Sequence, residues 1–208
     1  MDIYSQSRCL FELVDGMKLT LTECKRSDPV LFNICQDVVK EIPVQVSRFI
    51  KTGETYKNVS HTNLKRKAVN YNCMTRFLSE HLGEKTVSVE KLAYDDNSTT
   101  MTLCKGMPLI ARINQKSLGV VNNEVFKIDD IKNECVVISN LLKERVEIPI
   151  SKINRLFYLA FCITIHKSQG ATFNEPYTIH EYHSLNWRLK YVALSRSSNI
   201  DHITIKLN

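Results

Sequence analysis

The sequence predicts an α/β protein in which a parallel sheet flanked by helices is interrupted in the chain by a small β-barrel. Residues 156–165 are almost entirely apolar, with Thr164 as the one polar member, which is typical of a fully buried strand of a parallel sheet. Residues 1–83 contain helical periodicity, whereas residues 84–152 contain five or six short β-rich runs. Residues 153–208 return to α/β patterning. We therefore expect one domain from residues 1–83 and 153–208, and an inserted β-rich module from residues 84–152.

The N-terminal region predicts a short helix over residues 8–15, a strand over 18–22 and then a longer helix. Asp28 followed by Pro29 marks the start of the longer helix, because aspartate is a good N-cap and proline suits the first turn. This helix must end before Pro43. Its expected inward face consists of Leu31, Ile34, Cys35 and Val38.

A short strand over residues 55–60 is followed by a long amphipathic helix that stops at Gly83. Apolar residues at spacings of four and three predict its inward face. That face would comprise Leu64, Ala68, Tyr71, Thr75, Leu78 and Leu82.

The remaining elements follow from the same patterns. In the inserted module we expect strands over 86–92, 99–104, 108–113, 120–128, 135–139 and 145–150, separated by Asn- and Asp-rich turns. After the buried strand at 156–165 we expect a strand over 177–180, a helix over 185–194 and a closing strand over 202–207.

The composition indicates a globular protein inside the cell. Of the 208 residues, 43% are hydrophobic and 24% are charged, which argues against wholesale disorder. The longest apolar run is shorter than the roughly 20 residues of a membrane span, and the N-terminus lacks the pattern of a signal peptide. Seven scattered cysteines without a CxxC pair argue against a disulfide framework and a zinc site, and indicate a reducing compartment. Cytoplasm, nucleus and viral replication site remain open.

The net charge of +6 is uneven along the chain. Residues 1–83 carry 12 basic and 9 acidic residues, and residues 153–208 carry 6 and 3, so each flank has an excess of three positive charges around a neutral middle. A polyanionic partner is compatible with this distribution, as is an ordinary solvated surface.

The polar turn that follows the apolar run is the strongest local signal for chemistry. In open α/β sheets, ligands bind beyond the carboxyl ends of the strands. The turn His166-Lys167-Ser168-Gln169-Gly170 offers a cation, hydroxyl and amide donors, and a glycine that permits close approach of the backbone. These groups suit phosphate oxygens. The alternative is a polar loop that starts a helix at Ser168.

Two arginines are further candidates for binding an anion. Arg196 stands at the end of the helix in YVALSRSSN, residues 191–199, and arginine offers a planar fork of donors to phosphate. Compensation of the helix dipole is the alternative for Arg196. Arg26 lies just before the Asp28 cap, where it could turn toward an anion or remain a surface residue.

Thr62 and Asn63 open the basic helix turn Lys65-Arg66-Lys67, and helix N-termini bind phosphate. Simple N-capping by Thr62 or Asn63 is the alternative. The spacing of His180 and His183 around Glu181 could suggest a metal, but such pairs are more often surface or packing residues. We predict no metal site.

Taken in chain order, these segments resemble the C-terminal half of a superfamily 1B DNA helicase of the Pif/RecD type. AFCITIHKSQGATF, residues 160–173, resembles the fifth motif of that family, and YVALSRSSN resembles its sixth. LTECKRSD, residues 21–28, is similar to the arginine-bearing fourth motif, and VSHTNLKRKAVN, residues 59–70, to the segment after it. Residues 106–128 resemble the start of the SH3-like module of this family.

The resemblance implies a second RecA-like domain, split in sequence, with an inserted SH3-like β-barrel. It implies ATP and Mg²⁺ as cofactors, held mainly by a first RecA-like domain. Arg196 and Arg26 would reach the γ-phosphate as catalytic cations, and Gln169 and Gly170 would lie at the nucleotide cleft. An aromatic residue that stacks on adenine is often found in related helicases where this chain has Lys25.

The same resemblance implies single-stranded DNA as a partner and translocation from 5′ to 3′. Thr164, His166, Lys167 and Ser168 would face the strand or support their loop, Thr62 and Asn63 would contact DNA phosphates, and the inserted module would guide the strand.

No GxxxxGK[ST] loop or Mg²⁺-binding carboxylate motif occurs in these 208 residues. In the family they belong to a first RecA-like domain upstream, so we expect that domain earlier in a longer protein or in another chain. We expect the chain alone to bind single-stranded DNA weakly and to hydrolyse no ATP. The composition, rich in Lys, Asn and Ile, suggests an AT-rich genome such as that of a large DNA virus. The alternative function is a non-catalytic module, derived from a helicase, that binds single strands or docks a protein.

Overall fold

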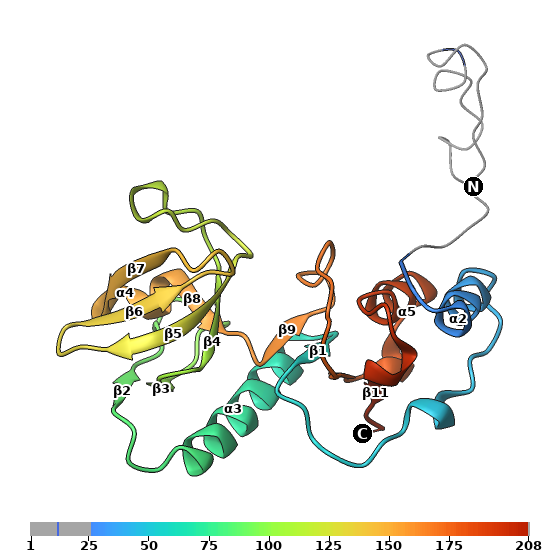
Figure 1. Cartoon of the computed structure of the whole chain (residues 1–208), viewed down its shortest axis with the longest axis horizontal. Coiled ribbons are helices and arrows are strands. Elements are labelled where there is room, and N and C mark those ends of the chain that lie inside the picture. The colour runs from blue at the N-terminus through green and yellow to red at the C-terminus, as the bar shows by residue number, and fades with distance from the viewer. Residues whose placement is uncertain (1–11, 13–25, 208) are drawn as a thin grey trace.

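The computed structural model describes Glu12 and residues 26–207, which form two lobes side by side. One lobe surrounds a parallel sheet and the other an antiparallel sheet (Figure 1). The helix expected at 8–15 and the strand expected at 18–22 lie outside the described residues, apart from Glu12.

The parallel sheet contains four short strands from two distant parts of the chain. They are β1 (Asn58–Ser60), β9 (Cys162–Thr164), β10 (Tyr177–Ile179) and β11 (Ile203–Ile205), in the order β11-β10-β1-β9. Every neighbouring pair is parallel, and Asn58 lies opposite both Cys162 and Thr178. The predicted fold class, a parallel sheet split in sequence and flanked by helices, is therefore confirmed.

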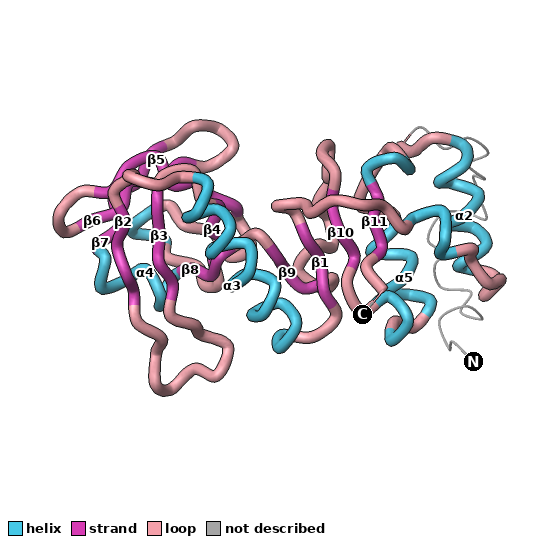
Figure 2. The backbone as a smooth tube through the Cα atoms, turned by 90° about the horizontal axis from the view of Figure 1, so that it is seen from below, coloured by secondary structure: helices cyan, strands magenta, loops and turns pink. Residues whose placement is uncertain are grey.

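Helices cover both faces of this sheet. On one face, α2 (Pro29–Val39) and α5 (Trp187–Leu194) share a core with apolar side chains of all four strands. On the other face, α3 (Asn63–Glu80) packs on β1 and β9 and also touches the antiparallel lobe, so it lies between the two sheets (Figure 2). Short 3₁₀ turns complete the described elements at Val46–Phe49, Lys116–Leu118, Tyr182–Ser184 and Ile200–His202.

Helix α2 begins and packs as the sequence predicts. The Asp28 carboxylate accepts a hydrogen bond of 2.8 Å from the backbone N–H of Leu31, and Pro29 occupies the first helical position. The four predicted inward residues are all buried, and the helix ends before Pro43.

The predicted inward face of α3 is wrong. Leu64, Tyr71 and Leu82 are 76%, 63% and 87% exposed. The buried face contains two polar residues, Arg66 and Asn70, whose side chains form hydrogen bonds within the chain, and so the apolar period pointed to the neighbouring face. The buried residues of α3 are Arg66, Val69, Asn70, Cys73 and Met74.

The apolar run at 156–165 is also not the single strand that we expected. A helix, α4 (Ile150–Leu156), comes first, and the run then divides into β8 (Phe157–Leu159) and β9. Strand β8 pairs antiparallel with β4 in the other lobe, while β9 joins the parallel sheet. Both strands are buried, so hydropathy does not reveal that they belong to different sheets.

The second lobe is built on a five-stranded antiparallel sheet in the order β7-β6-β5-β4-β8. Its strands are β4 (Pro108–Ala111), β5 (Val125–Ile131), β6 (Cys135–Ser139) and β7 (Arg145–Pro149), together with β8. A separate antiparallel pair consists of β2 (Thr86–Val89) and β3 (Met101–Cys104). All six strands expected in 84–152 are present, although the strand expected at 120–128 begins later, at Val125.

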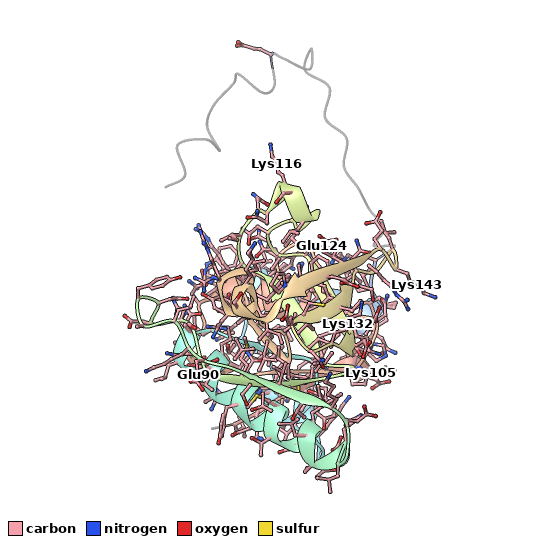
Figure 3. All side chains as sticks on the ribbon, turned by 90° about the vertical axis from the view of Figure 1, so that its left-hand side faces the viewer. Glu90, Lys105, Lys116, Glu124, Lys132 and Lys143 are labelled. Atoms are coloured by element: carbon pink, nitrogen blue, oxygen red, sulfur yellow. The ribbon has the colours of Figure 1, made fainter. Side chains whose placement is uncertain are left out.

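Charged side chains of both signs surround the antiparallel lobe rather than gathering in one basic patch. Figure 3, which views the molecule from the side of this lobe, labels two glutamates and four lysines spread over it: Glu90, Lys105, Lys116, Glu124, Lys132 and Lys143. This distribution agrees with the neutral charge of residues 84–152. Within residues 26–207 no helix has the length and apolar character needed to cross a membrane.

Asn70 completes the hydrogen bonding of the outer sheet strand β9. Its side-chain amide donates to the carbonyl oxygen of Cys162 at 2.8 Å, and its Oδ1 accepts from the N–H of Cys162 at 2.9 Å. These backbone groups lie on the outer side of β9, the last strand of the sheet, where no other described strand pairs with them.

We predict that Asn70→Ala lowers the free energy of unfolding by about 2–4 kcal/mol, because it leaves a buried N–H and a buried carbonyl without partners. Urea denaturation measures this loss. Asn72→Ala, at an exposed position of the same helix, is the control and should change stability by less than about 0.5 kcal/mol. Equal losses in the two variants would show that the Cys162 contacts contribute nothing.

Candidate nucleotide and nucleic-acid site

The loop after β9 is a compact turn held by its own backbone. The N–H of Ser168 donates to the carbonyls of Thr164 and Ile165, and the buried Ser168 hydroxyl donates to Ile165 O at 2.7 Å. Gly170 has a φ of 88°, a conformation that glycine adopts without strain. Gln169 and Gly170 are exposed at the tip. Ser168 therefore supports the loop, which is the second of the two roles foreseen for it.

Arg196 follows α5 and is enclosed by this loop. Its side chain is only 6% exposed and donates to the carbonyl oxygens of Ser168 at 3.2 Å and Ala171 at 3.1 Å. It also donates to Val192 O at 2.8 Å and to Ser195 Oγ at 2.9 Å. All of these acceptors are neutral, so the guanidinium is fixed in place while its charge is not compensated.

Arg26 approaches the same Ala171 carbonyl. Its Nη2 lies 3.5 Å from Ala171 O and 3.4 Å from Thr172 Oγ1. Neither Arg26 nor Arg196 forms an ion pair with a described carboxylate. Burial and then the nearby charge of Arg26 lower the pKa of Arg196. Two arginines that have no carboxylate partner in the described part of the chain, beside the exposed Gln169–Gly170 tip, suit a multiply charged anion.

The four residues expected at the nucleotide site are thus brought together, although they come from opposite ends of the chain. Lys25, which stands at the position of a stacking aromatic residue in related helicases, lies outside the described residues.

The start of α3 is occupied by a carboxylate that the sequence analysis did not assign. Thr62 caps α3 by accepting a bond of 3.2 Å from the N–H of Lys65. The Glu181 carboxylate accepts bonds from the N–H groups of His61 and Thr62, both at 2.9 Å, and from the Thr62 hydroxyl at 2.8 Å. The N–H groups of His61 and Thr62 and the Thr62 hydroxyl are therefore already used within the chain.

Glu181 follows β10 and Thr62 follows β1, so both lie at the carboxyl end of the parallel sheet. This shared position is the sequence signal that could have identified Glu181 as a site residue. Burial alone would raise the pKa of Glu181, but the hydrogen bonds from Thr62 and His61 outweigh burial and lower it. Asn63 turns its Oδ1 toward Arg66, whose Nε donates to it at 3.0 Å.

On the β9 side of this edge, the remaining predicted nucleic-acid residues differ in exposure. His166 is exposed, while Thr164 is half-buried and accepts a bond of 3.4 Å from the Lys167 N–H. The Lys167 ammonium lies 5.7 Å from the ring centroid of Tyr158. Burial, followed by the charges of Arg66 and Arg112, lowers the pKa of Lys167.

His180 and His183 do not converge. His180 is buried and lines a cavity of about 260 Å³ against α3, whereas His183 lines a different cavity beside Val44 and Trp187. Within residues 26–207 no group of three or more His, Cys, Asp or Glu side chains is placed to hold a metal ion.

Comparison with known proteins gives matches among solved structures alone. No protein-family model and no curated protein matches the chain. A structure of two coordinating Pif1 helicases at forked double-stranded DNA matches with a TM-score of 0.68 at 17% identity, covering 89% of this chain and 48% of that one.

Two further Pif1 structures match in the same way. Pif1 from Bacteroides with ADP-AlF₃ and single-stranded DNA has a TM-score of 0.67 at 18% identity, covering 91% of this chain and 52% of that one. Pif1 from Candida albicans has a TM-score of 0.63 at 14% identity, covering 87% and 54%. The chain therefore shares the fold of part of these helicases and spans about half of their length.

The buried His180, which directly follows β10, should make the stability of the protein depend on pH. The Asn58 amide nitrogen donates to the carbonyls of Thr55 and Phe161, so its Oδ1 accepts from His180 Nε2–H at 3.0 Å, and the imidazole is neutral. The pKa of His180 is lowered to about 4, mainly by burial and in smaller part by the charges of Lys65 and Lys206, while Glu181 opposes them.

The unfolded chain binds a proton at His180 below about pH 6.5, whereas the folded chain does not until about pH 4. The free energy of unfolding should therefore decrease as the pH is lowered from about 6.5 to about 4. We predict a contribution of roughly 3 kcal/mol between pH 7 and pH 4, removed by His180→Asn. Urea denaturation at several pH values measures it, with His183→Asn as the control. The same pH dependence in wild type and His180→Asn would contradict the prediction.

Proposed function

We propose that the chain is the second RecA-like motor domain of an ATP-dependent DNA helicase of the Pif type. The observation that carries this proposal is the convergence of Arg26 and Arg196 on the carbonyl of Ala171, with no described carboxylate paired to either. A first RecA-like domain, from the same or another chain, would complete the cleft and hold most of the ATP and Mg²⁺.

In this cleft the two arginines would act on the γ-phosphate. Cations fixed before the reaction stabilise the charge that develops in the transition state without having to reorganise. Four neutral acceptors hold Arg196 in this way, while the exposed Arg26 would approach from outside. The neighbour from Bacteroides was solved with ADP-AlF₃ and single-stranded DNA, which supports nucleotide use and DNA binding by this fold.

The loop of residues 165–171 would connect nucleotide and DNA. Near its start, Lys167 would meet the DNA backbone, and at its end the Ala171 carbonyl contacts both arginines. Closure of the cleft around ATP would therefore move the grip on the strand. Thr164 and His166 would line the strand beside Lys167, with Ser168 as their support.

The remaining assignments follow from the family resemblance. Thr62 and Asn63 would contact DNA phosphates after the Glu181 carboxylate is displaced. Residues 84–152 would form an SH3-like module that guides the strand, inserted into the motor domain of residues 1–83 and 153–208, with β8 of the following segment completing the sheet of the module. Translocation would run from 5′ to 3′ inside the cell, where cysteines stay reduced.

A non-catalytic module that binds single-stranded nucleic acid is the second candidate. Lys167, whose ammonium forms no ion pair with the residues that the structure describes, would serve such a module equally well, but the arrangement of Arg26 and Arg196 would have no use in it. ATP turnover therefore separates the two functions.

We predict that Arg26→Ala in the complete helicase lowers ATP turnover by about 10³-fold or more, the scale of an arginine finger, with little change in single-strand affinity. Arg196→Ala should do the same, but it also removes contacts within the chain, so the exposed Arg26 is the cleaner site. Phosphate release in the presence of oligo(dT) measures turnover. Turnover within about twofold of wild type in Arg26→Ala, or turnover by the 208-residue chain alone, would refute the proposal.

We predict that Glu181→Gln raises affinity for oligo(dT) by about three- to tenfold at low salt, because a neutral amide holds the Thr62 donors less tightly and does not repel phosphate. Fluorescence anisotropy measures the affinity. Glu175→Gln makes the same change of charge at an exposed residue just before β10, and it is the control. Equal gains in the two variants would assign the effect to net charge and remove Thr62 from the DNA site.

A further inference from the structure

Four segments bring a cluster of charged side chains around Tyr158 in β8. The Arg66 guanidinium from α3 and the Arg112 guanidinium, which follows β4, each lie 4.5 Å from the Tyr158 ring centroid. The Lys167 ammonium, from the loop after β9, lies 5.7 Å away. Asp95, in the connection between β2 and β3, accepts from the Tyr158 hydroxyl at 3.2 Å. Both lobes therefore contribute to this cluster.

The cluster contains more positive than negative charge. Asp95 pairs with Arg112 at 2.5 Å and is the one carboxylate among the cluster contacts in the described part of the chain. Arg66 donates to neutral acceptors, namely Asn63 Oδ1 and Asn97 O. Lys167 forms no ion pair with any residue in 26–207, and its ammonium has no acceptor there. The three cations thus face a single negative charge.

Burial makes this excess costly. Arg66 is 5% exposed, and the side chains of Arg112 and Asp95 are 19% and 12% exposed. Burial is the main cause that lowers the pKa of Arg66 and of Lys167, and the two neighbouring arginines lower that of Lys167 further. Cation–π contact with Tyr158 offsets part of the repulsion. An anion beside the half-buried Lys167 would offset the rest.

We propose that this cluster is a binding site for one phosphodiester group of single-stranded DNA, with Lys167 and Arg112 as its charged contacts, Arg66 as a supporting charge and Tyr158 as the positioning residue. The site rests on the proposed function and adds Arg66, Arg112 and Tyr158 to it. It also differs from the Thr62 loop, where Glu181 already accepts the available hydrogen bonds. In the Tyr158 cluster, by contrast, the half-buried Lys167 forms no ion pair with any residue in 26–207.

A phosphate at this position would connect the two lobes. Lys167 belongs to the loop that also contacts Arg196, whereas Arg112 and Tyr158 belong to the antiparallel sheet. A bound DNA strand would therefore hold the antiparallel lobe against the loop after β9, which contacts Arg196. The antiparallel lobe would then take a direct part in binding DNA.

The test is the salt dependence of oligo(dT) binding by the full chain, followed by fluorescence anisotropy from low to moderate salt. Each phosphate contact on a single strand contributes about 0.7 to the slope of log affinity against log salt. We expect Arg112→Gln and Lys167→Gln each to reduce the slope by about 0.7 and the low-salt affinity about five- to tenfold. The double variant should lose less than the sum of the two, because both bind the same phosphate.

Two controls separate charge from structure. Arg112→Lys keeps the charge and should retain the wild-type slope, whereas a purely structural role of the guanidinium would not be rescued. Arg145→Gln removes an arginine that pairs with Asp129 in the same lobe, at an exposed position, and should leave the slope unchanged. Thermal melting confirms that each variant is folded.

The outcomes are distinguishable. Wild-type slope and affinity in Arg112→Gln, with salt-dependent binding by the wild type, would overturn this site and leave the proposed function standing. Equal competition by polyglutamate of matched length would assign the cluster to an acidic peptide and overturn it as well. Absence of any salt-dependent binding by the wild-type chain would overturn both this site and the DNA side of the proposed function.

Discussion

A buried guanidinium whose hydrogen-bond acceptors within residues 26–207 are all neutral organises the candidate site of this protein. Arg196 draws the carbonyl oxygens of Ser168 and Ala171 toward itself, and these contacts fix both halves of the loop after β9. The loop conformation in turn directs Lys167 toward Tyr158 and leaves Gln169 and Gly170 exposed. Because the acceptors carry no formal charge, the arginine orders the loop while its field remains available to a ligand. A carboxylate at the same place would hold the loop equally well but would cancel that field.

Short-range patterns account for much of the fold. Helix α2 was predicted from a cap, a proline and one apolar face, all of which act within a few residues. Two predictions were wrong, one because a buried residue of α3 is polar and one because two consecutive buried strands belong to different sheets. Asn70 is buried because it bonds to the backbone of a strand 92 residues away, and β8 and β9 are both apolar although they enter different sheets. Neither fact has a local signature in the sequence.

The candidate site divides in the same way. Arg26, Arg196, Gln169 and Gly170 were each assigned from their local sequence, and the structure places the two arginines on the loop that carries Gln169 and Gly170. Glu181 and Tyr158 were not assigned, since their roles depend on partners across the sheet edge and across the two lobes. Hydrogen-bond capacity is the physical reason: whether Thr62 is open to a ligand depends on what already accepts from it.

The position of Asn70 has a consequence for how the molecule behaves among its own copies. An edge strand with free N–H and carbonyl groups is a template on which a strand from another molecule can add. In β9, which lies at the end of the parallel sheet, Asn70 occupies both backbone groups of Cys162. The Asn70 side chain thus forms the two hydrogen bonds that an added strand would form with Cys162, but it exposes no new backbone groups to a further strand. One amide therefore protects the strand that leads into the functional loop from edge-to-edge aggregation.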